Sequence, residues 1–176
     1  MTEDLRELAR RVREGDPASA GELLRALYGV VRKQIHFQIA DAALAEDAVQ
    51  ETMIALHRAL PKFRGDASPK TWAIAIAVRI ARRIRRRSER YVVDTELDIA
   101  VFDTDAAGAA ELAMLRGALA ELAPKKREAF VLMAIFELTA EEAGQALGTF
   151  ANTAASRYRH ARAELEQLLR RRGDEP

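Results

Sequence analysis

Residues 63–72 combine two aromatic rings with closely spaced hydrogen-bond donors and acceptors, a mixture that could hold an unstacked nucleic-acid base. Phe63 and Trp72 flank the segment, and such rings stack on bases in proteins that bind single strands. The groups between them that could meet the edge of a base are Arg64, Gly65, Asp66, Ser68, Lys70 and Thr71. Alternatively, the two rings pack between helices, which is the interpretation we favour for Trp72.

A dense series of arginines follows and could neutralise phosphates. It comprises Arg79, Arg82, Arg83, Arg85, Arg86, Arg87 and Arg90. Phosphate neutralisation gives an affinity that falls as salt rises. Consecutive arginines cannot all share one helix face, so some must point away from any single partner. The alternative is a solvated helix end, where cations favour the negative pole of the helix dipole.

The C-terminal part has the pattern of a helix-turn-helix, a motif that places its second helix in the major groove of DNA. Thr139 and Glu142 form a capping box that opens a short helix, and Gly148 begins a tight turn. We predict that Asn152 caps the last helix. The side chains presented to bases or phosphates are then those of Asn152, Thr153, Ala155, Ser156, Arg157, Arg159 and Arg162. An ordinary helical hairpin with a solvated basic face is the alternative.

A further polar face lies on the helix expected at 44–60. It is formed by Glu46, Asp47, Gln50 and Glu51. Such a face is either simply solvated or docks a basic helix of a partner.

Metal and enzyme chemistry find little support in the sequence. His36, His57 and His160 are isolated, with no carboxylate arrangement of metal-ligand spacing, and we expect each at the surface or a boundary. The chain has no cysteine, no glycine-rich phosphate loop and no nucleophile elbow. We therefore predict neither a metal or cofactor site nor an enzyme.

The composition favours helices that pack closely through small residues. Of the 176 residues, 49% are hydrophobic but only 6% aromatic, and alternating runs rich in Val, Ile and Thr are nearly absent. The amphipathic, charged start is unlike a signal peptide, and no apolar run approaches the ~20 residues of a membrane span. We expect a cytoplasmic protein without membrane insertion.

Charge and periodicity divide the chain in two. The net charge is only +1, but basic zones flank an acidic stretch that lacks helical periodicity. We predict an all-α fold with two small helical domains, 1–89 and 108–176, joined by a flexible acidic linker, 90–107. Helices are expected at 3–14, from 17 onward with Gly29 as a candidate break, 44–60, 69–87, from 109 onward, 124–136, 139–147 and 152–171.

In this order the parts resemble the extracytoplasmic-function (ECF) sigma factors, the compact branch of the main sigma family of bacterial RNA polymerase. One match is AEDAVQETMIALHRALPKFRGDASPKTW, which resembles the family's core-binding helix and promoter-melting loop. The other is ALAELAPKKREAFVLMAIFELTAEEAGQALG with TFANTAASRYRHARAEL, which resembles the family's fourth conserved region. The resemblance covers roughly residues 16–170.

The resemblance implies roles for individual residues. Those matching the motif that binds the polymerase clamp are Asp47, Gln50 and Glu51. Those assigned to opening and holding the minus-10 element are Phe63, Arg64, Gly65, Asp66, Ser68, Lys70, Thr71, Trp72, Arg79, Arg82, Arg83 and Arg86, with Arg85 and Arg87 at the same basic helix end. Those assigned to the minus-35 element are Asn152, Thr153, Ser156, Arg157, Arg159 and Arg162.

Several positions depart from the family's pattern. After Trp72 the family usually has an arginine and an asparagine, where this chain has Ala75 and Arg79, and Val78 stands where a basic residue is common. Proline replaces a bulky residue at position 69, and Asn152 and Ala155 replace the usual glycine and lysine of the recognition helix. Loss of a phosphate-contacting lysine weakens DNA binding and lowers its salt dependence by about one unit.

The resemblance implies a transcription initiation factor that needs no cofactor. Its partners would be core RNA polymerase, double- and single-stranded promoter DNA, and an anti-sigma factor, and we expect a monomer when it is free. A sigma-like decoy that binds an anti-sigma factor without promoter activity is the alternative, favoured slightly by the missing basic residues at 75, 78 and 155. A stand-alone helix-turn-helix repressor would explain only the C-terminal half and predicts a homodimer.

Overall fold

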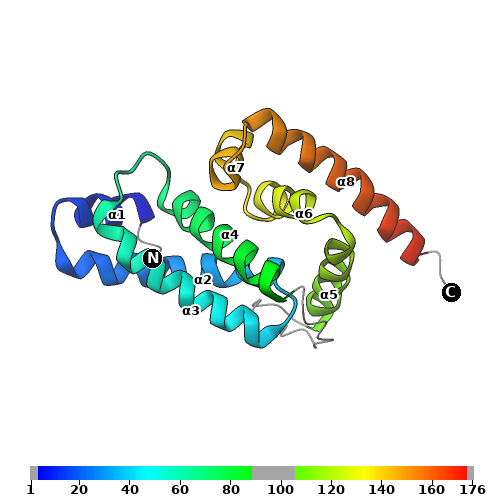
Figure 1. Cartoon of the computed structure of the whole chain (residues 1–176), viewed down its shortest axis with the longest axis horizontal. Coiled ribbons are helices and arrows are strands. Elements are labelled where there is room, and N and C mark those ends of the chain that lie inside the picture. Colours follow the sequence, from blue (N-terminus) through cyan, green and yellow to red (C-terminus); the bar gives the residue numbers. More distant parts are fainter. Residues whose placement is uncertain (1–3, 89–105, 174–176) are drawn as a thin grey trace. The chain divides into compact units, whose positions relative to one another are not determined.

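The computed structural model describes residues 4–88 and 106–173, and Figure 1 shows its helices in chain order. All regular structure in these residues is helical, so the predicted all-α fold is confirmed. The chain forms two compact units, Met1–Asp94 and Thr95–Pro176 (units 1 and 2). The acidic linker predicted at 90–107 lies outside the described residues, except for its last two, which belong to a helix.

Unit 1 is a bundle whose helices start at recognisable caps. Its described elements are α1 (Leu5–Arg13), α2 (Pro17–Gln38), α3 (Ala42–Ala59), the 3-10 turn Leu60–Lys62 and α4 (Pro69–Ser88). The carboxylates of Asp4, Asp16 and Asp41 accept hydrogen bonds from backbone N–H groups in the first turns of α1, α2 and α3. These bonds satisfy donors that a helix start leaves without partners.

The core of unit 1 forms around α2, which packs against α1, α3 and α4. Leu23, Leu27, Val31 and Ile35 recur at helical spacing along α2 and are fully buried. Burial of each such side chain stabilises the fold by roughly 1.5–3 kcal/mol. The short α1 adds Leu8 and Ala9 to the same core, so it is fixed to the bundle.

The candidate break at Gly29 is wrong, because α2 continues unbroken from Pro17 to Gln38. Gly29 lies on the exposed side of the helix, opposite the buried stripe. A glycine in a helix costs about 1 kcal/mol relative to alanine. The apolar residues on either side of Gly29 bury enough surface to outweigh that cost.

Unit 2 contains the second set of helices. Its described elements are α5 (Ala106–Glu121), α6 (Pro124–Phe130), a π-helical turn (Val131–Ile135), α7 (Ala140–Leu147) and α8 (Ala151–Gly173). Pro124 occupies the first position of α6, as predicted. The helix predicted at 124–136 widens at its end, where the Phe136 N–H donates to the Val131 carbonyl at 3.1 Å.

Candidate nucleic-acid and partner interface

Phe63 and Trp72 brace the two ends of the segment that joins α3 to α4. Phe63 follows the 3-10 turn and is only 8% exposed within the core of unit 1. Trp72 is half-buried on the first turn of α4, and the two ring centroids lie 4.8 Å apart at 46°. The packing interpretation favoured for Trp72 also describes Phe63. Phe63 therefore supports the loop from below instead of offering its ring to a base.

Residues 63–68 form a loop that is exposed at positions 64–66. Gly65 at its tip has φ +84°, a left-handed conformation that side chains rarely adopt. Arg64 and Asp66 on either side pair with each other at 3.1 Å, and both side chains are exposed. The loop thus presents one cation and one carboxylate to solvent at a sharp turn.

Ser68 caps the start of α4. The Ser68 hydroxyl accepts from the Thr71 N–H at 3.0 Å and lies 2.8 Å from the Thr71 hydroxyl. Pro69 takes the first helical position, which its fixed φ near −65° suits. Its side chain is buried. The polar groups of Ser68 and Thr71 are therefore held together at the base of the loop.

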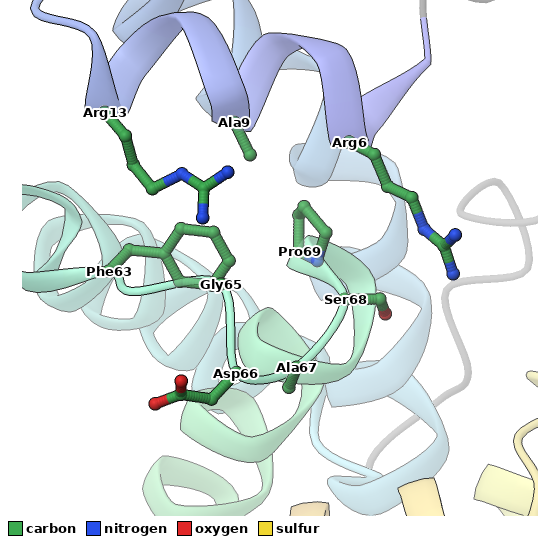
Figure 2. Close-up of a pocket in the computed structure, with 9 residues that line it drawn as sticks. All are labelled: Arg6, Ala9, Arg13, Phe63, Gly65, Asp66, Ala67, Ser68 and Pro69. Atoms are coloured by element: carbon green, nitrogen blue, oxygen red, sulfur yellow. The ribbon is translucent and has the colours of Figure 1, made fainter.

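A residue that the sequence analysis did not single out also holds this loop. The Arg13 guanidinium, at the end of α1, donates from Nη1 to the Arg64 carbonyl at 2.9 Å. Figure 2 shows Arg13 extending from α1 to the loop, above Phe63 and beside Gly65. The cavity between α1 and the loop has a volume of about 350 Å³ and is also lined by Arg6.

The arginines of α4 divide into different roles. Arg79 and Arg86 are exposed, and each donates from Nε to the carbonyl four residues earlier on the helix. Arg85 instead donates to the Gln38 side chain at 2.7 Å, which ties α4 to the end of α2. Arg83 pairs with Glu51 of α3. The predicted spread of these arginines over several faces is confirmed, and Arg90 lies outside the described residues.

The polar face of α3 is not uniform. Asp47 and Gln50 are exposed, whereas Glu51 is half-exposed beside Arg83. Ile54, one turn further on, is 52% exposed and lines a groove between α3 and α4 together with Glu51 and Arg83. Ile54 is thus an exposed apolar residue between charged groups, which the sequence analysis did not single out.

Glu46 turns inward, away from that face. Its carboxylate accepts from Arg32 Nε at 3.0 Å and lies 3.1 Å from His36 Nε2. Burial alone would raise the pKa of Glu46, but the hydrogen bonds to His36 and Arg32 outweigh it and lower the pKa below its usual value. The expectation that His36 lies at the surface or a boundary is wrong, since it is 2% exposed, with its polar edge on Glu46.

In unit 2, α7 and α8 form the predicted helix-turn-helix. The capping box is confirmed: Thr139 Oγ1 accepts from the Glu142 N–H, and the Glu142 carboxylate accepts from the Thr139 N–H. Gly148 ends α7 with φ +66°. A Cβ on Gly144 would lie 2.9 Å from the Thr149 carbonyl oxygen, so only glycine lets α7 approach the turn this closely.

The prediction that Asn152 caps the last helix is wrong. α8 begins at Ala151, and the carbonyl of Phe150 accepts from the Thr153 and Ala154 N–H groups, each at 3.0 Å. Asn152 therefore lies inside the first turn with an exposed side chain. Because α8 starts at Ala151, the residue immediately before the helix is Phe150 and not Asn152.

The other residues assigned to the second helix lie along its first turns and middle. Thr153, Ser156 and Arg157 are partly exposed, and Arg159 is exposed. Arg162 donates from Nε to Glu166 at 3.0 Å, and this hydrogen bond raises the pKa of the arginine above its usual value. A DNA phosphate at Arg162 would have to compete with that carboxylate.

Comparison with known proteins agrees with this arrangement. The Sigma-70 region 2 model matches residues 20–91, and the Sigma-70 region 4 model matches residues 112–165. The RNA polymerase sigma factor NccH of Alcaligenes xylosoxydans xylosoxydans is 32% identical to this chain, over 92% of each sequence. The ECF RNA polymerase sigma factor SigM of Mycobacterium tuberculosis is 28% identical, over 88% of this chain and 79% of SigM.

This chain belongs to the ECF sigma factors. Its function is thus that of a sigma factor, which brings RNA polymerase to promoters and takes part in opening them.

Solved structures of sigma factors share the fold. CnrH, in complex with the cytosolic domain of CnrY, aligns with a TM-score of 0.71 at 26% identity, over 93% of this chain and 96% of CnrH. The sigma factor RpoE of Bartonella quintana, in complex with the anti-sigma factor NepR, aligns with a TM-score of 0.73 at 22% identity, over 85% and 96%.

The family match also shows why Arg13 was missed in this sigma factor. The region 2 match begins at residue 20, so α1 lies outside it. The contact from Arg13 to Arg64 spans 51 residues, and no spacing pattern in either segment predicts it.

Phe150 is a second residue of this sigma factor that sequence reasoning missed. It sits in the turn between α7 and α8 and is 85% exposed. An aromatic ring so exposed at a helix-turn-helix is available to DNA or to a partner. A large apolar residue within a predicted tight turn is the signal that could have identified it.

Across 4–88 and 106–173, no group of three or more His, Asp or Glu residues is placed to hold a metal ion. Within the same ranges, none of the helices combines the length and the apolar character needed to cross a membrane.

Proposed function

We propose that this sigma factor binds core RNA polymerase through the outer face of α3, with Asp47, Gln50 and Glu51 in contact. Asp47 and Gln50 share an exposed face at i, i+3 spacing. The Arg83 guanidinium beside Glu51 shows that a cation already fits there, so a basic helix of the polymerase would replace or join it. Ile54, exposed at the same edge, adds apolar contact area.

The second element of the proposal is opening of the minus-10 element by the 63–68 loop and α4. Unstacking a base costs a few kcal/mol, which a preformed site must offset. The exposed Arg64 and Asp66 offer a donor and an acceptor for a base edge, and Phe63 and Trp72 hold the loop in place from within unit 1. The exposed arginines of α4, Arg79 and Arg86 among them, supply the phosphate contacts.

The third element is recognition of the minus-35 element by α8. Asn152, Thr153 and Ser156 lie within its first two turns, where a recognition helix meets base edges, and Arg157 and Arg159 follow. The departures at Ala75 and Ala155 remove potential phosphate contacts, whereas Val78 is buried. We therefore expect each unit alone to bind DNA weakly. Two weak contacts on one chain gain affinity through effective concentration, which suits domains at 1–89 and 108–176 joined by the 90–107 linker.

Regulation by an anti-sigma factor follows from the relatives. CnrH and RpoE, which share this fold, have both been solved with such a partner or a cytosolic protein domain bound. We propose the same control here, with the free sigma factor monomeric and acting in the cytoplasm. In this role the polymerase supplies the chemistry, and the sigma factor needs no cofactor and no catalytic group of its own.

One observation carries the proposal: an exposed loop on unit 1 and an exposed recognition helix on unit 2 occur in a chain of this family. The test is run-off transcription with core RNA polymerase on a pooled genomic promoter library, with and without the protein. Discrete new starts that share two spaced upstream motifs are expected. Asp47→Lys should abolish them by weakening core binding, whereas Arg159→Ala should leave core binding intact.

The decoy hypothesis makes the opposite prediction in the same assay. The missing basic groups at positions 75 and 155 favour it, whereas position 78 is buried and bears on neither hypothesis. A protein that binds core RNA polymerase but yields no promoter-specific start would overturn the initiation mechanism and support the decoy. Absence of core binding as well would contradict both.

A further inference from the structure

The connection between α1 and the 63–68 loop has a specific geometry. Arg13 is the last residue of α1, and its Nη1 donates to the Arg64 carbonyl oxygen at 2.9 Å. A hydrogen bond with a charged donor is stronger than one between neutral groups. Because the acceptor belongs to the backbone, the bond restrains the path of the loop whatever side chain stands at position 64.

Gly65 contributes a second restraint at the same point. With φ at +84°, it occupies the left-handed region that glycine tolerates best. A Cβ added there would lie 2.4 Å from Arg13 Nη1 and 3.3 Å from Arg13 Cζ. The guanidinium therefore lies directly on the bare face of the glycine. A side chain at position 65 would be strained by the backbone φ and would also displace the Arg13 guanidinium from its place beside the loop.

The helix that carries Arg13 is itself firmly anchored. Leu8 and Ala9 are buried in the core of unit 1. Arg11, two residues before Arg13, pairs with Glu22 of α2 at 2.7 Å and lies 3.8 Å from Asp16. A guanidinium fixed at the end of such a helix can hold a loop in one position, whereas one on a frayed terminus could not.

We propose that Arg13 is a positioning residue for promoter opening. It holds the Arg64–Asp66 turn in the conformation that receives an unstacked base, and it acts through the loop backbone instead of touching DNA. The inference rests on the proposed function of the 63–68 loop. It places α1, which lies outside the family match, within the melting apparatus of this sigma factor.

Arg6 provides a matched control. It lies on the same helix and lines the same cavity, and Figure 2 shows its guanidinium directed away from the loop. Arg6→Ala therefore removes the same charge near the same site without removing the bond to Arg64. Arg13→Lys keeps the charge and a single donor for the carbonyl, so it should recover part of the function.

The experiment measures opening by holoenzymes of full-length variants on a duplex promoter obtained from the run-off assay, with 2-aminopurine in the minus-10 element. Arg13→Ala should slow opening roughly two- to tenfold, which corresponds to the net free energy that one hydrogen bond typically contributes. Core affinity and the salt dependence of promoter binding should stay unchanged, Arg6→Ala should match wild type, and Arg13→Lys should fall between.

A double-mutant cycle tests the contact itself. Gly65→Ala in the wild-type background meets both the left-handed φ and the guanidinium, whereas in the Arg13→Ala background only the φ remains. Gly65→Ala should therefore slow opening less in the Arg13→Ala background than in wild type, by a factor of roughly two or more. Independent effects of the two substitutions would contradict the proposal.

Failure of the positioning role and failure of the proposed function give different results. Wild-type opening by Arg13→Ala holoenzyme, or equal losses in Arg6→Ala and Arg13→Ala, would overturn the positioning role while leaving the sigma mechanism intact. A salt dependence lowered by about one unit in Arg13→Ala alone would show a direct phosphate contact and overturn it as well. A wild-type holoenzyme that opens no promoter would overturn the proposed function together with this inference.

Discussion

The 63–68 loop of unit 1 and the 148–150 turn of unit 2 each contain a glycine in the left-handed region, yet their surroundings differ. Gly65, with φ +84°, lies under the guanidinium of Arg13, whose hydrogen-bond partner Arg64 is 51 residues further along the chain. Gly148, with φ +66°, has nothing within 4 Å of where its Cβ would be. One segment is shaped by tertiary contacts and the other by its neighbours in the sequence.

That difference bears on function. The turn is set by the Thr139 capping box, by Gly148 and by the close approach at Gly144, all within about a dozen residues. Local chemistry therefore sets the turn, whereas α8 itself also packs against α6, where Lys126 donates to Glu164. The loop depends on Phe63, Trp72 and Arg13, so its shape is only as stable as the packing of unit 1.

The largest expected effect on stability is at Phe63, because this residue begins the loop and is buried in the core of unit 1. Phe63→Ala should lower the free energy of unfolding of unit 1 by about 3 kcal/mol, through lost burial and the cavity left behind. Site-resolved hydrogen exchange of the α2 amides measures it. Phe63→Leu is the control and should cost about 1 kcal/mol. An equally small loss in both variants would show that the loop does not depend on the core.

The matching test in unit 2 is Gly144. Gly144→Ala places a Cβ 2.9 Å from the Thr149 carbonyl oxygen, and backbone cannot move aside as a flexible side chain can. We expect a loss of about 2 kcal/mol in the free energy of unfolding of unit 2, measured on the α8 amides, with weaker minus-35 binding.

Gly148→Ala is the control for that test. Its Cβ meets no atom, and only the left-handed φ is penalised, so it should cost about 1 kcal/mol. If Gly148→Ala proved the more harmful of the two, backbone strain rather than the close approach would dominate this turn.

The same contrast explains which features the sequence could predict. The capping box at Thr139 depends on residues three positions apart and is confirmed, and the caps at Asp16 and Ser68 are equally local. One wrong prediction is itself local, since α8 begins at Ala151 and Asn152 is not its cap. The other two depend on residues buried in unit 1. The buried stripe of α2 carries the helix past Gly29, and a contact with Glu46 draws His36 into the interior.

The site follows the same rule. The family resemblance placed the loop and the recognition helix, and local spacing supports both. It could not show that Phe63 is structural, that Arg83 is paired with Glu51, or that Arg13 holds the loop. Each of these depends on side chains that meet only after the helices have packed.

A smaller effect, similar in both units, is expected at the helix caps. Thr139→Ala and Ser68→Ala each remove a side-chain acceptor for a backbone N–H in a first turn. Each should cost about 1 kcal/mol of its own unit's free energy of unfolding. Hydrogen exchange in α7 and α4 measures the two effects. A far larger loss at Ser68 would show that the Ser68–Thr71 pair supports more than a helix start.

Glu46 gives a pH-dependent test of unit 1. Its folded-state pKa is lowered below 4.5, so its contribution to stability is present above that value and lost as pH falls through the folded pKa. Its side chain is 38% exposed, so solvent screening limits the effect. Glu46→Gln should cost about 1 kcal/mol at neutral pH.

The measurement for Glu46 is urea unfolding at a series of pH values. The difference between wild type and Glu46→Gln should shrink as pH falls from about 4.5 through the lower folded-state pKa, because the wild-type carboxylate takes up its proton first in the unfolded chain. Asp47→Asn, at the neighbouring exposed position, is the control and should change little. A difference that stayed constant with pH would mean that the contact with Arg32 and His36 does not act through charge.

The smallest stability effect, and the sharpest test of unit 2 as a DNA reader, is expected at Arg159. It is exposed on α8, so Arg159→Ala should change the free energy of unfolding by less than about 0.5 kcal/mol. If it contacts a phosphate, the salt dependence of holoenzyme binding to the promoter should fall by about one unit.

Glu166→Gln should strengthen promoter binding, because it frees Arg162 from the 3.0 Å ion pair that competes with DNA. Stronger binding in Glu166→Gln with no change in Arg159→Ala would place the phosphate contact one turn further along the helix.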